Sequence, residues 1–268
     1  TIILEARATK DKAELEEIRK MGQITTSVVK RVQDFLSAHR VVDETLVKAD
    51  GSPLTVGDVK SLINLWLAEA GAENPEATIF AIGRDGGIPH SSGTPSDPIK
   101  LGKSIVFDIF PCQEGGGYFY DFTRTWSLGY ATEELQQAYD QVKEVYQQVA
   151  AELAMGVQAS KYQDLTCELF EEMGHETIRQ NAAVEEGYIH SVGHGLGLNV
   201  HEKPWLGRQP DPANILRIGS VFTLEPGLYY PSKGYGVRIE DTWFVNEDGG
   251  FEKFVDYPME LVVPMKGG

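Results

Sequence analysis

The chain has 268 residues, with 24 Lys or Arg against 40 Asp or Glu, which gives a formal net charge of -16 at pH 7. An acidic surface repels phosphate backbones and anionic lipids, so nucleic acids and membranes are poor partners for this protein. Its 41% hydrophobic residues fit a globular fold, and its two cysteines, with no signal-peptide pattern, favour a reducing, cytoplasmic location.

Helical and strand patterns are mixed along the chain, which predicts one α+β domain spanning residues 1–268. Apolar residues recur every three or four positions in the expected helices, and apolar runs bounded by turn residues mark the expected strands. In chain order, we expect a helix over 9–39, a helix over 55–70, a strand over 78–82, strands over 104–110 and 118–127, helices over 133–154 and 161–173, and strands over 221–229 and 236–245.

The first of two notable hairpins is IVFDIFPCQEGGGYFYDFTRTW, residues 105–126. A turn near residues 114–116 places Asp108 and Asp121 at equal distances from its centre, directly across from each other. Like charges that face each other between apolar strands are unfavourable, so the pair needs a cation or a shared proton. Pro111 cannot donate to a strand ladder, so we expect an irregularity there.

The second hairpin, FTLEPGLYYPSKGYGVRIEDT, repeats this arrangement around a turn at residues 231–234. Glu225 and Glu240 are equidistant from the middle of that turn. One such pair could be an acid–base dyad, or simply carboxylates on a solvated strand face. Two pairs carry four negative charges, which two divalent cations would cancel, so together with a histidine they favour a metal site.

A glycine-rich strip, HSVGHGLGLNVHEKP, lies between the hairpins and holds His190, His194 and His201, three of the six histidines. Its glycines disfavour a helix and let the backbone approach a metal or a substrate. The strip contains no HExxH motif and is not preceded by the strand that a dinucleotide-binding loop requires. The sequence also lacks a GxSxG serine-hydrolase elbow, and we interpret Cys112 as a buried or incidental thiol.

In order along the chain, five motifs resemble those of the "pita-bread" metallopeptidase family, which includes methionine aminopeptidase, Xaa-Pro aminopeptidase and Xaa-Pro dipeptidase (prolidase). The resemblance implies a curved antiparallel sheet with helices on its outer face. It also implies five metal ligands, which here are Asp108 in VFDIFP, Asp121 in YDFTRT, His194 in GHGLG, Glu225 in TLEPG and Glu240 in VRIED.

Within this family, His190 and the run GVRIED, with Arg238, are typical of the Xaa-Pro enzymes. The resemblance assigns substrate binding to His190 and Arg238. His90 in IPHSSG and His201 in VHEKP match the family's catalytic histidines, and Glu225 would also transfer a proton. Relatives usually carry an N-terminal domain before the catalytic one; we expect it to be absent here, because the chain starts at a segment that resembles the join between the two.

The resemblance therefore predicts hydrolysis of the N-terminal Xaa-Pro bond of peptides or dipeptides, with two divalent ions, Mn²⁺ as first choice and Co²⁺, Fe²⁺ or Zn²⁺ as alternatives. Other readings remain open: a peptidase of the methionine aminopeptidase type, a non-catalytic peptide-binding module, or a metal-free hydrolase of this fold. A peptide substrate is the expected partner, and a homodimer is left open.

Overall fold

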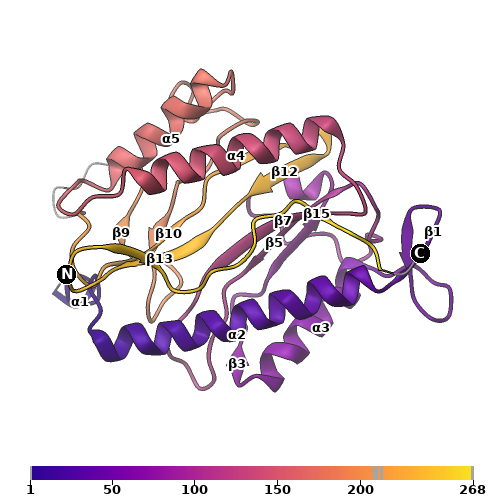
Figure 1. Cartoon of the computed structure of the whole chain (residues 1–268), viewed down its shortest axis with the longest axis horizontal. Coiled ribbons are helices and arrows are strands. Elements are labelled where there is room, and N and C mark those ends of the chain that lie inside the picture. Colours follow the sequence, from indigo (N-terminus) through magenta and orange to yellow (C-terminus); the bar gives the residue numbers. More distant parts are fainter. Residues whose placement is uncertain (1, 208–210, 212–213, 267–268) are drawn as a thin grey trace.

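The computed structural model describes residues 2–207, 211 and 214–266. It places strands between two pairs of helices, with α2 and α3 on one side and α4 and α5 on the other (Figure 1). The helices are α1 (Ile2–Ala6), α2 (Lys12–Ser37), α3 (Val56–Glu69), α4 (Glu133–Ala151) and α5 (Ser160–Glu172). Every helix expected from the sequence is present within a few residues of its predicted ends.

The helices begin where the sequence supplies a capping residue. At the start of α2, the Asp11 side chain accepts from the backbone N–H of Glu14, and the Glu14 carboxylate accepts from the backbone of Asp11. Thr55 and Asp58 form the same reciprocal pair at the start of α3. Such capping boxes satisfy N–H groups that have no partner within the helix, which explains why the boundaries were predictable.

Two long central strands are buried along their whole length, and five sheets contain all of the named strands. They are β1 (Arg40–Val42), β2 (Thr45–Val47), β3 (Ala72–Glu73), β4 (Ile79–Ile82), β5 (Ser104–Ile109), β6 (Cys112–Gln113), β7 (Phe122–Leu128), β8 (His194–Gly195), β9 (Glu202–Trp205), β10 (Val221–Leu224), β11 (Gly227–Tyr230), β12 (Tyr235–Arg238), β13 (Asp241–Val245), β14 (Phe251–Lys253) and β15 (Val262–Val263).

Two sheets carry most of these strands. One has the order β15-β7-β5-β4, and the other has the order β14-β13-β10-β8-β9. Among the described strands of these two sheets, every pair is antiparallel except β15 with β7, which is parallel. A bridge between Thr123 of β7 and Glu240, which lies between β12 and β13, joins the two strand systems.

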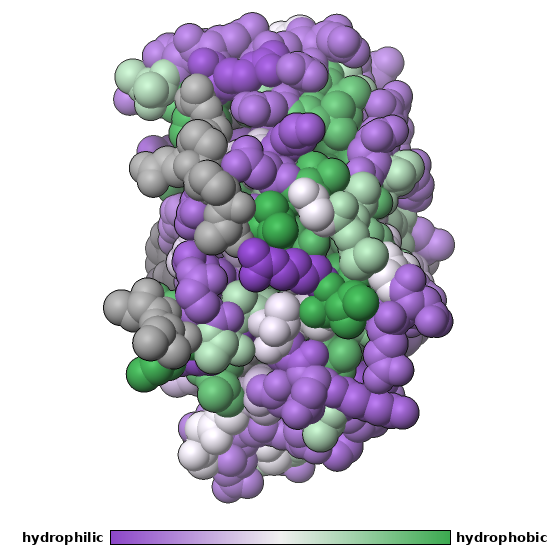
Figure 2. All heavy atoms as spheres, turned by 90° about the vertical axis from the view of Figure 1, so that its left-hand side faces the viewer, coloured by the Kyte–Doolittle hydropathy of each residue, from purple (hydrophilic) through white to green (hydrophobic). Residues whose placement is uncertain are grey.

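Two apolar clusters stabilise this arrangement. The first packs α2 and α3 against β4, β5 and β7, with Val29, Ile63 and Phe107 fully buried. The second packs α4 and α5 against β10 to β13, with Val142 and Phe170 fully buried. Hydrophilic side chains cover most of the molecule's side that carries α1 and β9, as expected for so charged a sequence (Figure 2).

The second hairpin has the predicted register. Val221 pairs with Phe244, Leu224 with Asp241, and Gly227 with Arg238, so the same offset holds on both sides of residues 225 and 240. The strands are interrupted there, since Pro226 lies between β10 and β11. Glu225 and Glu240 therefore occupy matching positions, as the symmetry about residues 231–234 predicted.

The first hairpin has a different register, and the prediction that Asp108 faces Asp121 is wrong. Asp108 pairs with Thr123, and Ile109 pairs with Phe122, so Asp121 stands opposite position 110. The turn is centred on Gly115 and Gly116, both of which have positive φ (81° and 83°), and not on residues 114–116. Two adjacent residues with positive φ are what a tight hairpin requires. Pro111 splits the strand into β5 and β6 without changing the offset, because Cys112 still bridges to Phe119.

Candidate metal and peptidase site

A cavity of about 140 Å³ lies where the two strand systems meet. Its lining contains all nine side chains that the sequence singled out, brought together from six separate segments. They are His90, Asp108, Asp121, His190, His194, His201, Glu225, Arg238 and Glu240, and the other lining residues are Glu76, Ile79, Phe110 and Val200.

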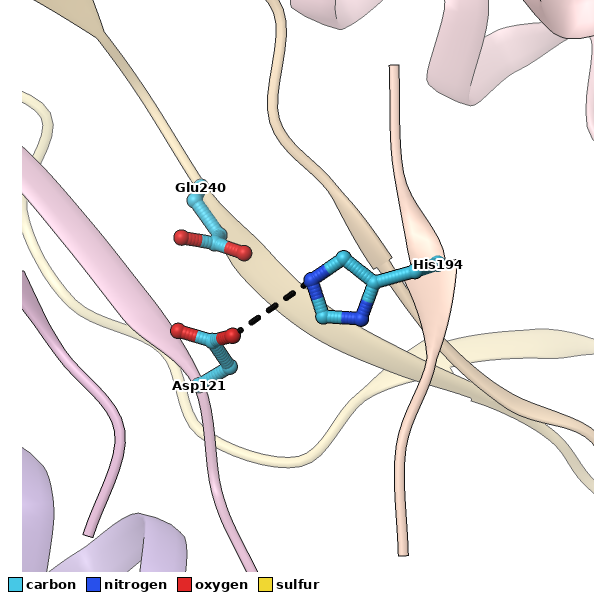
Figure 3. A group of neighbouring side chains, drawn as sticks. All are labelled: Asp121, His194 and Glu240. Carbon is cyan, nitrogen blue, oxygen red and sulfur yellow. Dashed lines mark ion pairs between the residues drawn. The ribbon is translucent and has the colours of Figure 1, made fainter. Parts of the chain in front are cut away.

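Three of these residues form a compact group of potential metal ligands (Figure 3). One ligand atom each from Asp121, His194 and Glu240 lies within 4.8 Å of the others. His194 Nε2 is 3.5 Å from Asp121 Oδ2 and 3.3 Å from Glu225 Oε1, so Glu225 borders the same group. A carboxylate–imidazole set of this kind suits a divalent transition metal.

The other nitrogen of His194 fixes the orientation of the ring. His194 Nδ1 lies 3.1 Å from the backbone oxygen of Gly195, to which it can only donate. In a neutral ring this leaves Nε2 as a lone-pair donor, directed toward Asp121 and Glu225. Burial lowers the pKa of His194 to about 3, which keeps the ring neutral at physiological pH.

Without a cation, the buried carboxylates resist ionisation. Burial, together with the neighbouring charges of Asp108 and Glu225, raises the pKa of Asp121 well above its ordinary value. Burial and the charge of Asp121 do the same for the pKa of Glu240. Burial raises the pKa of Glu225 to about 8. Such a group of carboxylates can ionise together only if positive charge is brought among them.

Unused oxygen atoms at this point support the same conclusion. Asp108 Oδ1, Asp121 Oδ1 and Glu240 Oε1 are buried and have no hydrogen-bond partner among the described residues. Buried polar atoms are normally paired, so three unpaired oxygens lining one cavity indicate a missing partner. A metal ion fits these donors, because it would be coordinated by oxygen atoms that no protein group satisfies.

Asp108 differs from the other predicted ligands because an arginine holds it. Arg238 Nη2 lies 2.5 Å from Asp108 Oδ2, and Arg238 Nη1 donates to the hydroxyl of Tyr229 at 2.8 Å. The guanidinium is almost fully buried, with 1% of the residue exposed. Asp108 thus retains one oxygen for a cation, while Arg238 fixes the orientation of the carboxylate.

Three further histidines line the same cavity. His190 Nε2 and His90 Nε2 are 3.0 Å apart, so one ring donates to the other. Burial and the charge of Arg238 lower the pKa of both rings, which favours the neutral forms that such a bond requires. His201 is exposed, and its ring centroid lies 4.3 Å from that of His194.

Sequence reasoning missed two threonines that support the carboxylates. Thr123 Oγ1 donates to Glu240 Oε2 at 2.6 Å, and Thr223 Oγ1 donates to Glu225 Oε1 at 3.3 Å. The sequence contains a signal for them, because each stands two residues from an acidic residue in the motifs DFT and TLE. Residues two apart on a strand share a face, so Thr123 lies on the same face as Asp121, and Thr223 lies on the same face as Glu225.

Comparisons with known proteins agree with this geometry. A sequence model described as "Metallopeptidase family M24" matches residues 16–247. The chain is 29% identical to the probable dipeptidase PepE of Mycobacterium tuberculosis over 98% of its own length and 62% of that protein's. It is 30% identical to the Xaa-Pro dipeptidase of Pyrococcus furiosus, covering 92% of this chain and 63% of that protein.

Among solved structures, the prolidase of Pyrococcus horikoshii OT3 superposes with a TM-score of 0.81 and 27% identity, covering 97% of this chain and 67% of that one. The fold is therefore the pita-bread fold that the motifs predicted. The chain spans less than two thirds of the length of both curated relatives named above. Within residues 2–207, 211 and 214–266, no helix is long and apolar enough to cross a membrane.

Proposed function

Because the chain belongs to metallopeptidase family M24, we propose that it is a metal-dependent exopeptidase that hydrolyses the bond between an N-terminal residue and proline. The observation that carries this proposal is the cavity in which buried, unpaired carboxylate oxygens meet a neutral histidine nitrogen. We further propose that residues 1–268 act as one catalytic domain in the cytoplasm. The Xaa-Pro preference draws support from relatives named Xaa-Pro dipeptidase and prolidase.

In this proposal, two divalent ions, with Mn²⁺ as first choice, are held by all five predicted ligands: Asp108, Asp121, His194, Glu225 and Glu240. Their combined charge offsets the four carboxylates. When bound, such ions polarise a carbonyl oxygen and lower the pKa of water enough to supply a nucleophile at neutral pH.

The remaining side chains bind the peptide and handle protons. His201 and His90 hydrogen-bond the substrate and the tetrahedral intermediate, whose oxygen becomes negatively charged. His90 can act there as a donor once its N–H leaves His190 Nε2. Glu225, whose Oε2 lies 3.4 Å from His190 Nδ1, takes the proton that the attacking water loses and passes it to the leaving nitrogen. This proton is essential for an Xaa-Pro bond, because the proline nitrogen carries no hydrogen. His190 and Arg238, which also line the cavity, bind the substrate.

The test uses purified protein that has been stripped of metal and then reloaded separately with Mn²⁺, Co²⁺, Fe²⁺ or Zn²⁺. We expect metal-dependent hydrolysis of Ala-Pro dipeptides or longer Ala-Pro peptides, with Met-Ala cleaved far more slowly. Asp121→Asn should lose both turnover and bound metal, whereas Asp248→Asn, at an exposed position, should retain both. Preferential cleavage of Met-Ala would instead favour the methionine aminopeptidase type. Full activity after exhaustive chelation would contradict the proposal.

A further inference from the structure

One charged residue of the cavity has no role in the function proposed above. Glu76 lines the cavity together with Ile79, Phe110 and Val200, and among the lining residues that the structure describes it is the only charged one outside the set of nine. Its side chain is exposed, unlike the buried carboxylates of the metal site. Glu76 therefore lies toward the opening, while the potential metal ligands lie deeper.

The turn that carries Glu76 is well fixed. The backbone N–H of Ala77 donates to the oxygen of Asn74 at 3.3 Å, and Ala77 has a φ of 64°, which is unusual for a residue with a side chain. Asn74 Nδ2 also donates to Asn64 Oδ1 at 2.8 Å and to Thr78 Oγ1 at 3.0 Å. These bonds connect the turn to α3 and to the start of β4, so the position of Glu76 is set by the fold.

The turn is also close in sequence to a strand that pairs with a predicted metal ligand. Ile79, three residues after Glu76, is the first residue of β4 and pairs with Asp108 of β5. Among the described residues, no hydrogen bond or ion pair engages the Glu76 carboxylate. The cavity thus combines an ionisable group that has no partner in the described part of the chain with the apolar side chains of Ile79, Phe110 and Val200.

Long basic side chains match this combination. Lys and Arg pack their aliphatic stems along apolar surface while the charged end stays near water and a carboxylate. The arginine of the cavity lining, Arg238, already pairs with Asp108, and burial lowers the pKa of His90 and so favours its neutral form, so neither side chain competes for Glu76. An acidic substrate side chain, in contrast, would meet a like charge at the opening.

We propose that Glu76 makes this site select peptides whose first residue is Lys or Arg, so that Lys-Pro and Arg-Pro bonds are preferred. The proposal rests on the function proposed above, in which proline fills the second position. The first residue is then the variable side chain next to the bond that is cleaved. Glu76 is a specificity residue in this view, and it takes no part in bond cleavage.

The test compares Lys-Pro with norleucine-Pro, which has a side chain of similar length without the charge. For the wild type, we expect kcat/KM to favour Lys-Pro by about two- to fivefold, the range for an exposed ion pair, and less at high salt. Glu76→Gln should bring the ratio close to one. Glu76→Lys should instead favour Glu-Pro over Gln-Pro. The matched control is Glu114→Gln, an exposed position outside the cavity lining, which should leave the wild-type ratio unchanged.

An equal Lys-Pro to norleucine-Pro ratio in the wild type and in Glu76→Gln would overturn the proposal. So would an equal loss for both peptides, since Glu76 would then act on the common α-ammonium group or on the fold. If no Xaa-Pro peptide is cleaved, the proposed function fails, and calorimetric binding of non-hydrolysable Lys and norleucine analogues decides the role of Glu76. Tighter binding of the Lys analogue that depends on Glu76 would support it, and equal binding would refute it.

Discussion

The stability of the metal-free protein should fall as the pH rises from 7 to 8.5. The pKa of Glu225 is raised from 4.5 to about 8 by burial, so the folded protein binds a proton there that the unfolded chain has already lost. A group with a raised pKa stabilises the folded state fully below its unfolded pKa and loses that contribution as the pH passes its folded pKa. Asp121 and Glu240, whose pKa values are also raised, act in the same direction.

The pH window is chosen to exclude opposing groups. The pKa values of His190 and His194 are lowered by burial from 6.5, so they cost stability only where the unfolded chain binds protons, below pH 7. For Glu225 alone, integrating the linkage relation from pH 7 to 8.5 gives a loss of about 1.3 kcal/mol. For a chain of this size, that corresponds to a fall in Tm of about 3–5 °C.

The assay is thermal unfolding of the metal-free protein at several pH values. Glu225→Gln is the matched control, because it removes this titration and keeps every other ionisable group, including the thiols of both cysteines. Its Tm should change less over the same window. Loading with Mn²⁺ should also flatten the pH dependence of the wild type, because the carboxylates are then ionised in the folded state. A wild-type Tm that is constant with pH, or a fall of equal size in Glu225→Gln, would refute the reasoning.

Three further perturbations follow from contacts around the site. Arg124→Met removes the guanidinium that pairs with Asp241 Oδ1, where both side chains are 0% exposed, and leaves that carboxylate only the Tyr146 hydroxyl and the more distant Lys253 on its other oxygen. We expect a loss of about 3–5 kcal/mol in thermal unfolding. Lys233→Met, which breaks an exposed pair with Glu134, should cost under about 1 kcal/mol, and equal costs would contradict this. Thr123→Val removes the hydroxyl that donates to Glu240 and should weaken Mn²⁺ binding, measured by calorimetry, about 10- to 100-fold. The control Thr25→Val in α2 should leave the affinity for Mn²⁺ unchanged, and an unchanged affinity in Thr123→Val would show that the bond to Glu240 is dispensable. The buried carboxylate of Glu202 pairs with Arg7 and Lys10 and accepts from the N–H of Asn199. Glu202→Gln should lower kcat/KM about 10- to 100-fold by displacing the neighbouring His201. The loss should vanish in a His201→Ala background, and an undiminished loss there would rule out action through His201.

The sequence predicts the elements of this fold well because their signals are local. Asp11 with Glu14 and Thr55 with Asp58 mark helix starts within four residues of sequence, and Gly234, with a φ of 78°, marks the second hairpin turn. The contact between the hairpins has no such signal. The bridge from Thr123 to Glu240 joins residues 117 positions apart, and no local pattern records which strand edges will meet. The same holds for Arg238 and Asp108, which are separated by 130 positions.

The predicted register of the first hairpin is wrong by two positions, yet Asp108 and Asp121 both line the cavity as expected. The predicted pairing puts the turn centre between residues 114 and 115, one residue before the observed centre between 115 and 116, and this moves the assigned partner of Asp108 by two positions, from Thr123 to Asp121. Side chains on a strand alternate with a period of two, so an even shift keeps both aspartates on the same face, whereas an odd shift would have turned one away. The convergence of Asp108 and Asp121 therefore depends on the parity of the register more than on direct pairing. Lengthening the turn by a single glycine after Gly116 is consequently a more severe change than lengthening it by two, and metal binding that survives a one-residue insertion but not a two-residue insertion would contradict this account.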